Sequence, residues 1–340
     1  MSVHKIEVEG LNTSFDCQEG DTLVRAALRA GIAFPYECNV GQCGSCRFEV
    51  IEGDVEASWA EAPALTPRDL RKGKKLGCQS KPRSDCKIKV RIDQNCTPHF
   101  RPQARAAELV SIRDVTHDLR EFHFKSYGKA EFIPGQYALM TLPGVEGPRA
   151  YSMCNQPNDE GDWCFLIKRV PGGAGTDYLF DDLKNGDKIT LDGPYGLAYF
   201  REGTYRDIVC VAGGSGLAPL ISIATAAAYH PAFQNRRIRF FFGGRGPADI
   251  CGDDYLRLLP GFGDRITFHS TISVPEMDPN GMWVGPVGFI HESVENLLGD
   301  DLKNYEYYIA GPPPMLQATL QMLAMKHKVN VEGIHFDRFF

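Results

Sequence analysis

The feature that most constrains this chain is a set of four cysteines with the spacing C-x4-C-x2-C-x31-C: Cys38, Cys43, Cys46 and Cys78. Three of these thiols fall on one short loop, so the loop can enclose only a compact metal centre and its backbone must turn sharply. Gly41 and Gly44 lie in that loop. Glycine permits positive φ and a close approach of backbone N–H groups to the metal-bound atoms. The segment around the cysteines is therefore predicted to fold about a metal centre.

The spacing resembles that of plant-type ferredoxins, in which four thiolates hold one [2Fe–2S] cluster. The alternatives are a structural zinc site or unrelated buried thiols. Zinc sites usually use two close cysteine pairs, whereas here one distant cysteine stands alone. The resemblance implies an N-terminal β-grasp [2Fe–2S] ferredoxin domain over residues 1–97. The other cysteines have no such spacing and are expected to be ordinary buried or partly exposed thiols: Cys17, Cys86, Cys96, Cys154, Cys164, Cys210 and Cys251.

Composition excludes several classes of protein. The chain has 340 residues, enough for two or three domains at roughly 150 residues each. Its net charge of −6 argues against nucleic acid as a partner. The most apolar stretch, residues 208–229, is interrupted by glycines and a proline, whereas a membrane span needs about 20 apolar residues. The first residues lack the apolar core of a signal peptide, so we expect a cytoplasmic protein with reduced thiols.

A second motif, Arg149-Ala150-Tyr151-Ser152, resembles the flavin-binding signature of the ferredoxin–NADP reductase superfamily. The resemblance implies that Arg149 binds the FAD pyrophosphate, that Tyr151 stacks on the isoalloxazine, and that Ser152 hydrogen-bonds near the redox-active N5. It also implies FAD contacts from a following strand and a glycine-rich helix start: Ile167, Lys168, Gly173, Gly175 and Thr176. Short strands between Gly- and Pro-containing turns across residues 103–202 predict an antiparallel β-barrel for this flavin domain.

Residues 203–340 alternate strand and helix patterns, which predicts a doubly wound parallel sheet and so a multidomain α+β and α/β chain. A glycine turn between a buried strand and the helix 217–229 suits a pyrophosphate, because free N–H groups and the helix dipole meet there. Its predicted NADH ligands are Gly213, Gly214, Ser215, Gly216 and Pro219. A second turn resembles the nicotinamide-binding turn of these reductases, with Ala310 replacing the usual Cys, and contributes Gly311, Pro312 and Met315.

Two finer expectations concern the nicotinamide domain. Related reductases place an aromatic C-terminal residue over the flavin, which implies that role for Phe340, or for Phe339. Together with Tyr151 and Ser152, Phe340 completes the predicted catalytic set, which contains no general base or nucleophile. Arg245 follows the second strand of the domain, where an arginine could meet a 2′-phosphate, but NADH-dependent relatives also tolerate arginine there. The resemblance therefore favours NADH.

The order ferredoxin, flavin barrel, nicotinamide domain is similar to that of single-chain reductase components of bacterial multicomponent oxygenases. Within that group the chain most resembles reductases of diiron aromatic and alkene monooxygenases and of Rieske dioxygenases. The resemblance implies that NADH gives two electrons to FAD and that the [2Fe–2S] cluster passes them singly to a terminal oxygenase, directly or through a small ferredoxin. The oxygenase would act on aromatic or other hydrocarbon substrates, and the reductase is expected to be a monomer.

Two other functions remain open at this point. The same domain order serves non-oxygenase partners such as sugar dehydratases. A relay subunit that does not itself oxidise NADH is the third possibility, although the intact turn at residues 213–219 argues against it.

Overall fold

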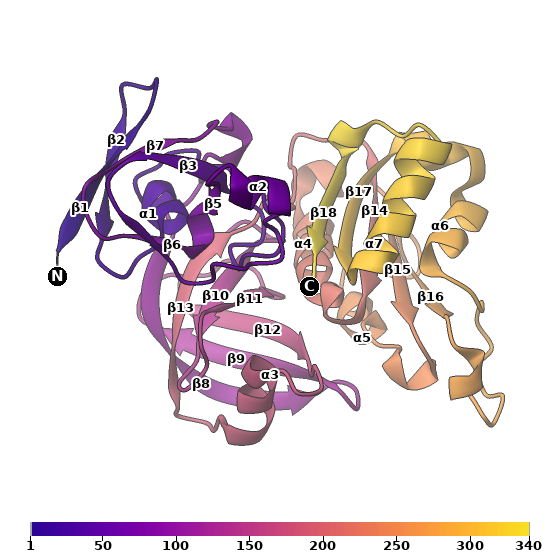
Figure 1. The fold of residues 1–340 in the computed structure, drawn as a ribbon. Helices are drawn as coiled ribbons and strands as arrows, with labels where there is room; N and C mark the ends of the chain where they lie inside the picture. Colours follow the sequence, from indigo (N-terminus) through magenta and orange to yellow (C-terminus); the bar gives the residue numbers. More distant parts are fainter. Residues whose placement is uncertain (1, 340) are drawn as a thin grey trace.

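The computed structural model describes residues 2–339, which form three domains in the order of the sequence. In Figure 1 the indigo N-terminal domain lies on the magenta barrel, and the orange and yellow C-terminal domain lies beside both. Within residues 2–339, no helix combines the length and the hydrophobicity that crossing a bilayer requires.

The N-terminal domain is a five-stranded sheet of order β2-β1-β7-β3-β5 that packs on one helix, α1 (Leu23–Arg29). Its strands are β1 (Val3–Val8), β2 (Ser14–Gln18), β3 (Arg47–Glu52), β5 (Lys75–Leu76) and β7 (Cys86–Lys89). A two-stranded sheet, β4 (Val55–Ala57) with β6 (Ser80–Pro82), and the short helix α2 (Pro67–Arg71) complete it. Parallel pairing of β1 with β7, between antiparallel neighbours, gives the expected β-grasp arrangement.

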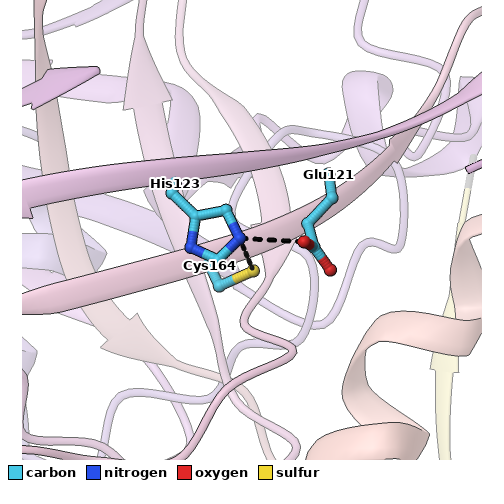
Figure 2. Close-up of side chains that lie close together, drawn as sticks. All are labelled: Glu121, His123 and Cys164. Carbon is cyan, nitrogen blue, oxygen red and sulfur yellow. Dashed lines mark hydrogen bonds and ion pairs between the residues drawn. The ribbon is translucent and has the colours of Figure 1, made fainter. Parts of the chain in front are cut away.

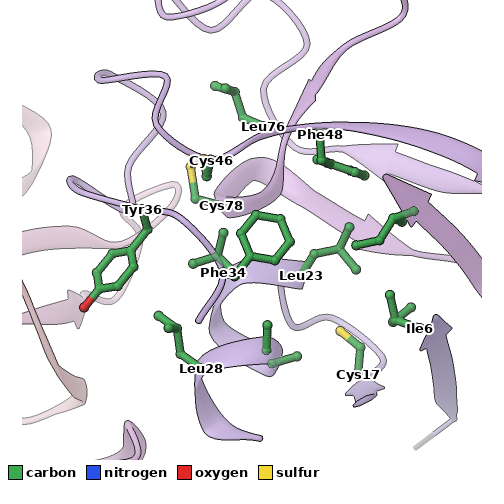
Figure 3. Close-up of a cluster of buried hydrophobic side chains, with 14 of the residues drawn as sticks. Ile6, Cys17, Leu23, Leu28, Phe34, Tyr36, Cys46, Phe48, Leu76 and Cys78 are labelled. Atoms are coloured by element: carbon green, nitrogen blue, oxygen red, sulfur yellow. Dashed lines mark hydrogen bonds between the residues drawn. The ribbon is translucent and has the colours of Figure 1, made fainter. Parts of the chain in front are cut away.

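The core of this domain lies between α1 and the sheet (Figure 3). Leu23 and Phe34 are fully buried there, and the predicted cluster ligands Cys46 and Cys78 belong to the same buried cluster. The same core continues into the barrel through Tyr137, Leu139 and Tyr195. The ferredoxin domain is therefore held by apolar packing and not by a linker alone.

The second domain is a six-stranded antiparallel sheet of order β11-β10-β13-β8-β9-β12. Its strands are β8 (Gln103–Asp114), β9 (Leu119–Ser126), β10 (Tyr137–Thr141), β11 (Arg149–Ser152), β12 (Asp162–Lys168) and β13 (Lys188–Tyr195). The two end strands approach each other where Met153, just after β11, bridges to Phe165 of β12. The sheet therefore curls into the predicted barrel, filled by large apolar side chains such as Phe122 and Trp163.

The third domain is a parallel sheet of order β16-β15-β14-β17-β18. Its strands are β14 (Asp207–Gly213), β15 (Ile238–Gly244), β16 (Ile266–Ile272), β17 (Tyr305–Gly311) and β18 (Ile334–Arg338). The helices are α4 (Leu217–Tyr229), α5 (Asp253–Arg257), α6 (Ile290–Leu298) and α7 (Pro313–Leu320). Along β14, Ile208 and Cys210 enter the core beneath α4 and α5, whereas Val209 and Val211 face α6 and α7. Both faces are buried, so the strand is apolar throughout, as in other parallel sheets.

Candidate functional site

The cluster loop has the backbone that its glycines predict. Gly41 and Gly44 have φ of +85° and +80°. A Cβ on Gly44 would lie 2.5 Å from the Arg47 guanidinium, which would have to move, and the positive φ would strain any other residue there. The N–H groups of Gln42 and Cys43 both point at the Cys38 sulfur, at 3.4 Å. Such N–H donors stabilise negative charge on a metal-bound thiolate.

The fold brings the four predicted ligands together as two pairs. The Sγ atoms of Cys46 and Cys78 are 3.4 Å apart. Cys46 directly precedes β3, whereas Cys78 lies in the turn after β5. The Cys38 and Cys43 thiols also hydrogen-bond each other, which lowers the pKa of Cys43. Two adjacent thiol pairs with inward N–H donors fit the donor set of a [2Fe–2S] cluster.

The segment that leads into the cluster loop is anchored on the barrel. Tyr137 of β10 donates a hydrogen bond of 2.6 Å to the Glu37 carbonyl oxygen. The Gly196 N–H donates to the Tyr36 hydroxyl at 3.2 Å, and the Tyr36 ring meets that of Tyr195 edge to face. The cluster loop therefore lies against β10, the strand that pairs with the flavin motif of β11.

An ion-pair group holds the same interface from its other side. Asp192 of β13 is 4% exposed and lies 2.6 Å from the Arg29 guanidinium of α1. Arg25, one turn earlier, approaches the same carboxylate at 3.9 Å, and Asp21 contacts both arginines. Charges buried in this way are tolerated only when paired. These ion pairs therefore join α1 of the ferredoxin domain to β13 of the barrel.

The predicted FAD-binding motif is assembled around α3 (Ala174–Asp177). A Cβ on Gly175 would lie 3.0 Å from Arg149 Cγ and 3.5 Å from the Tyr151 hydroxyl, so the helix start touches both side chains. Arg149 Nη1 donates to the carbonyls of Glu146, Gly147 and Pro148, which fixes its guanidinium beside α3. A positioned guanidinium next to free helical N–H groups fits a pyrophosphate.

The remaining residues predicted to bind FAD differ in whether their side chains are free to contact the cofactor. The Thr176 hydroxyl closes the turn before α3 by bonding to Val170 and to the Gly173 carbonyl. Ile167 is 1% exposed and its side chain lies in the barrel core, so it can reach a cofactor only through its backbone. Lys168 points into the cleft beside the nucleotide domain and lies 2.8 Å from Asp118.

The two turns predicted to bind NADH, far apart in sequence, are in direct contact. A Cβ on Gly213 would lie 2.7 Å from Met315 Sδ and 3.2 Å from Pro312. Gly311 has φ of +152° and lies against the Gly213 backbone, and a Cβ on Gly216 would lie only 2.0 Å from the Ala310 carbonyl oxygen. Both turns follow the carboxyl ends of neighbouring parallel strands, where open α/β sheets bind ligands.

The other two predicted NADH residues complete this edge. Ser215 is half-buried at the start of the turn, and Pro219 is buried in the first turn of α4. Gly214 lies against the Lys168 side chain of β12. The nucleotide turn therefore touches the flavin barrel directly.

The end of the chain returns to the point where the three domains meet. Phe339 lies beside the nicotinamide turn, and its N–H donates to the Gly311 carbonyl at 3.1 Å. Phe340, the residue predicted to cover the flavin, lies outside the described residues. Asp337 is buried near Glu37, and burial, reinforced by that carboxylate, raises the pKa of Asp337 to about 7.

Two features were not predicted from the sequence. Nothing in the sequence signals that Tyr36 and Glu37 contact Tyr137 across the domain boundary. Cys154 and Cys164 are buried free thiols, as expected, but their Sγ atoms are 2.9 Å apart and His123 lies beside them. The only sequence signal for that group was two cysteines and a histidine in neighbouring short strands.

Comparison with known proteins supports the same three modules. Family models match an iron–sulfur cluster binding domain of the 2Fe-2S type at residues 6–83, an oxidoreductase FAD-binding domain at 106–200 and an oxidoreductase NAD-binding domain at 210–321. The chain is 40% identical to the ferredoxin–NAD(P)+ reductase CarAd of Metapseudomonas resinovorans, over 99% of this chain and 100% of that protein.

Two further matches also span the whole chain. It is 37% identical to the ferredoxin–NAD+ reductase component of the alkene monooxygenase system of Xanthobacter autotrophicus, over 96% of this chain and 98% of that one. The solved structure of the ferredoxin reductase in carbazole 1,9a-dioxygenase superposes with a TM-score of 0.91 at 37% identity, covering 100% of this chain and 99% of that one. This chain therefore belongs to the ferredoxin–NAD(P)+ reductases that join [2Fe–2S], FAD-binding and NAD-binding domains in one polypeptide.

Proposed function

We propose that this reductase takes electrons from NADH and delivers them one at a time to the terminal component of a multicomponent oxygenase, directly or through a small ferredoxin. The observation that carries the proposal is the meeting of all three sites. Tyr137 joins the cluster loop to the flavin barrel, and Lys168 joins the barrel to the nucleotide turn. With the sites in contact, electrons could pass from the nicotinamide to the flavin and from the flavin to the cluster.

The chain's own residues bind and orient, and they perform no acid–base step in this proposal. When bound, FAD supplies the exchange between two-electron hydride chemistry and single-electron transfer. Arg149 and the start of α3 would hold its pyrophosphate, Tyr151 would support its ring and Ser152 would donate a hydrogen bond to it. The turns at residues 213–219 and 311–315 would hold the nicotinamide nucleotide, and the proposed aromatic cover of the flavin is Phe340, or Phe339. The four cluster cysteines would hold the [2Fe–2S] cluster from which electrons pass to the acceptor protein.

NADH is the proposed donor because carboxylates lie beside the cationic side chains in the cleft between the barrel and the nucleotide domain, and a carboxylate repels the 2′-phosphate of NADPH. Asp249, just after β15, accepts hydrogen bonds from the Arg245 and Gly246 N–H groups at 3.0 and 3.1 Å. Burial opposes its ionisation, but the Gly246 N–H and nearby Lys168 hold the pKa of Asp249 below its usual value. In dinucleotide-binding folds an acidic residue after the second strand favours a ribose hydroxyl over a 2′-phosphate. Asp249 is buried and bonded within the chain, so it would act here mainly by repelling a 2′-phosphate. The Arg245 side chain is already 3.7 Å from Asp249.

The relatives suggest the acceptor. Relatives named for phenol 2-monooxygenase and for xylene/toluene monooxygenase are 29% and 31% identical to this chain over nearly its full length. An aromatic or other hydrocarbon oxygenase is therefore the proposed destination of the electrons. We further propose a cytoplasmic monomer with domain limits at 1–97, 103–202 and 203–340.

The test is an anaerobic titration of the purified chain with NADH and, separately, with NADPH, followed by visible absorption. We expect NADH to bleach both the flavin and the [2Fe–2S] bands at much lower concentration than NADPH. Full cofactor content without bleaching by either nucleotide would instead identify a relay subunit. Reconstitution with an aromatic or alkene terminal oxygenase then tests the acceptor, because product formation must depend on the reductase and on its cluster cysteines.

A further inference from the structure

Three side chains that can bind a metal ion meet on the barrel, away from the iron–sulfur loop, and the thiol of Cys154 lies next to one of them. Figure 2 shows the three, Glu121, His123 and Cys164, with their side chains pointing toward one another. His123 Nε2 lies 2.8 Å from Glu121 Oε1 and 3.5 Å from Cys164 Sγ. The Cys154 Sγ lies 2.9 Å from that of Cys164. Together they provide two thiols, an imidazole and a carboxylate.

Strand register explains why these residues meet. In the antiparallel pair β9 and β12, His123 stands directly opposite Cys164. Glu121 lies two residues before His123 and so occupies the same face of β9. Cys154 follows β11, and its N–H donates to the Cys164 carbonyl at 2.8 Å. Three strands thus contribute donors to one point at the closing seam of the barrel.

We propose that Cys154, Cys164, His123 and Glu121 form a zinc site. A tetrahedral zinc ion with bonds of about 2.0–2.3 Å separates imidazole nitrogen from sulfur by about 3.6 Å and two sulfurs by about 3.8 Å. The His123–Cys164 distance of 3.5 Å already fits. The two thiols must separate by about 0.9 Å from their present 2.9 Å, and the carboxylate must withdraw slightly from the imidazole. Cys154 lies outside the group whose ligand atoms are all within 4.8 Å of one another, so its side chain must also rotate toward Glu121 and His123.

Neighbouring groups already orient the carboxylate. Arg113 contacts Glu121 through two hydrogen bonds, of 3.1 Å to Oε1 and 3.0 Å to Oε2. Tyr255 of α5 donates to Oε2 at 2.6 Å. Such outer contacts fix ligand carboxylates in known metal sites. Because Tyr255 belongs to the nucleotide domain, the bound ion would stabilise the contact between that domain and the barrel.

Burial favours a metal over an exposed reactive thiol pair. Cys154 and Cys164 are 6% and 5% exposed, and Glu121 is 6% exposed. The side chain of His123 is 44% exposed and leaves an entry path for an ion. Mixed sulfur, nitrogen and oxygen donors in tetrahedral geometry select zinc among common divalent ions. The competing outcome is a disulfide between the two cysteines, which the same experiment detects.

The experiment measures zinc and iron in the full-length holoprotein after incubation with ZnCl2 and gel filtration. We expect about one zinc ion per chain in addition to the cluster iron. His123→Ala and Cys164→Ala should reduce the zinc at least tenfold and leave iron and flavin unchanged. The matched controls His269→Ala and Cys210→Ala should retain it, because neither residue belongs to this group or to the other group of potential metal ligands found in residues 2–339.

X-ray absorption at the zinc edge of the unmutated protein keeps the test decisive if a variant misfolds. Two sulfurs at about 2.3 Å with two nitrogen or oxygen ligands at about 2.0–2.1 Å would support the site. Four sulfur ligands would place zinc in the cluster loop and overturn the proposal. Absence of bound zinc would also overturn it, as would a peptide map showing the Cys154–Cys164 disulfide in the protein as purified.

Discussion

Gly216 offers the sharpest test of how the nucleotide turn is built. Its backbone has φ of −59° and ψ of −11°, which any residue can adopt, so only space forbids a side chain. In Gly216→Ala the new Cβ would lie 2.0 Å from the Ala310 carbonyl oxygen and 2.8 Å from the Gly311 nitrogen. These are backbone atoms of β17, which cannot rotate away as a side chain could.

The expected size of the effect follows from that distance. An ordinary carbon–oxygen contact needs about 3.3 Å, so the turn and the end of β17 must separate by about 1.3 Å. Overpacking of this kind costs about 1–3 kcal/mol of stability. A displacement of about 1 Å at a substrate-positioning element can cost on the order of 100-fold in rate. We therefore expect kcat/KM for NADH to fall by about 100-fold, while flavin and iron contents stay normal.

The assay is NADH-dependent ferricyanide reduction, which reports on flavin reduction without the cluster. Gly203→Ala is the matched control, because its Cβ would meet nothing within 4 Å. Gly203→Ala should behave as the unmutated protein does. Unchanged NADH kinetics in Gly216→Ala, with unchanged thermal stability, would refute the conclusion that the close approach of Gly216 to the Ala310 backbone fixes the conformation of the turn.

Three further predictions address the other sites. Cys46→Ser should abolish NADH-dependent cytochrome c reduction but retain ferricyanide reduction, whereas Cys86→Ser should retain both; loss of both activities in Cys46→Ser would contradict separate sites. Tyr137→Phe removes the hydrogen-bond donor to the Glu37 carbonyl oxygen, which should destabilise the fold by about 1–3 kcal/mol. It should also lower the rate of cytochrome c reduction relative to that of ferricyanide reduction. An unchanged ratio of the two rates would show that this contact does not position the cluster loop. Because the pKa of Asp337 is raised to about 7 in the fold, its ionisation should lower stability progressively between about pH 4 and pH 7, by at most about 4 kcal/mol. Melting temperatures should show that loss in the unmutated protein and not in Asp337→Asn; parallel pH curves would disprove it.

The sequence alone determined the local chemistry of each module. Three of the four predicted cluster ligands lie on one short loop, and the nucleotide turn is also one short segment. The conformation of both follows from glycines with positive φ and, for the turn, from a strand that leads into a helix. The helix at residues 217–229 has the predicted limits, because its apolar residues and the preceding turn specify it locally.

Contacts that depend on strand register and on how the domains pack together could be seen only in the tertiary structure. His123 and Cys164 are 41 residues apart and meet only because β9 and β12 pair in one register. Ile167 turns its side chain into the core because of the barrel's closure, not because of its own sequence. Tyr137 reaches Glu37 only because two domains share one apolar core. Short-range sequence patterns specify turns and strands, but the pairing of distant segments is set by the packing of the whole chain, and that packing joins the three cofactor sites.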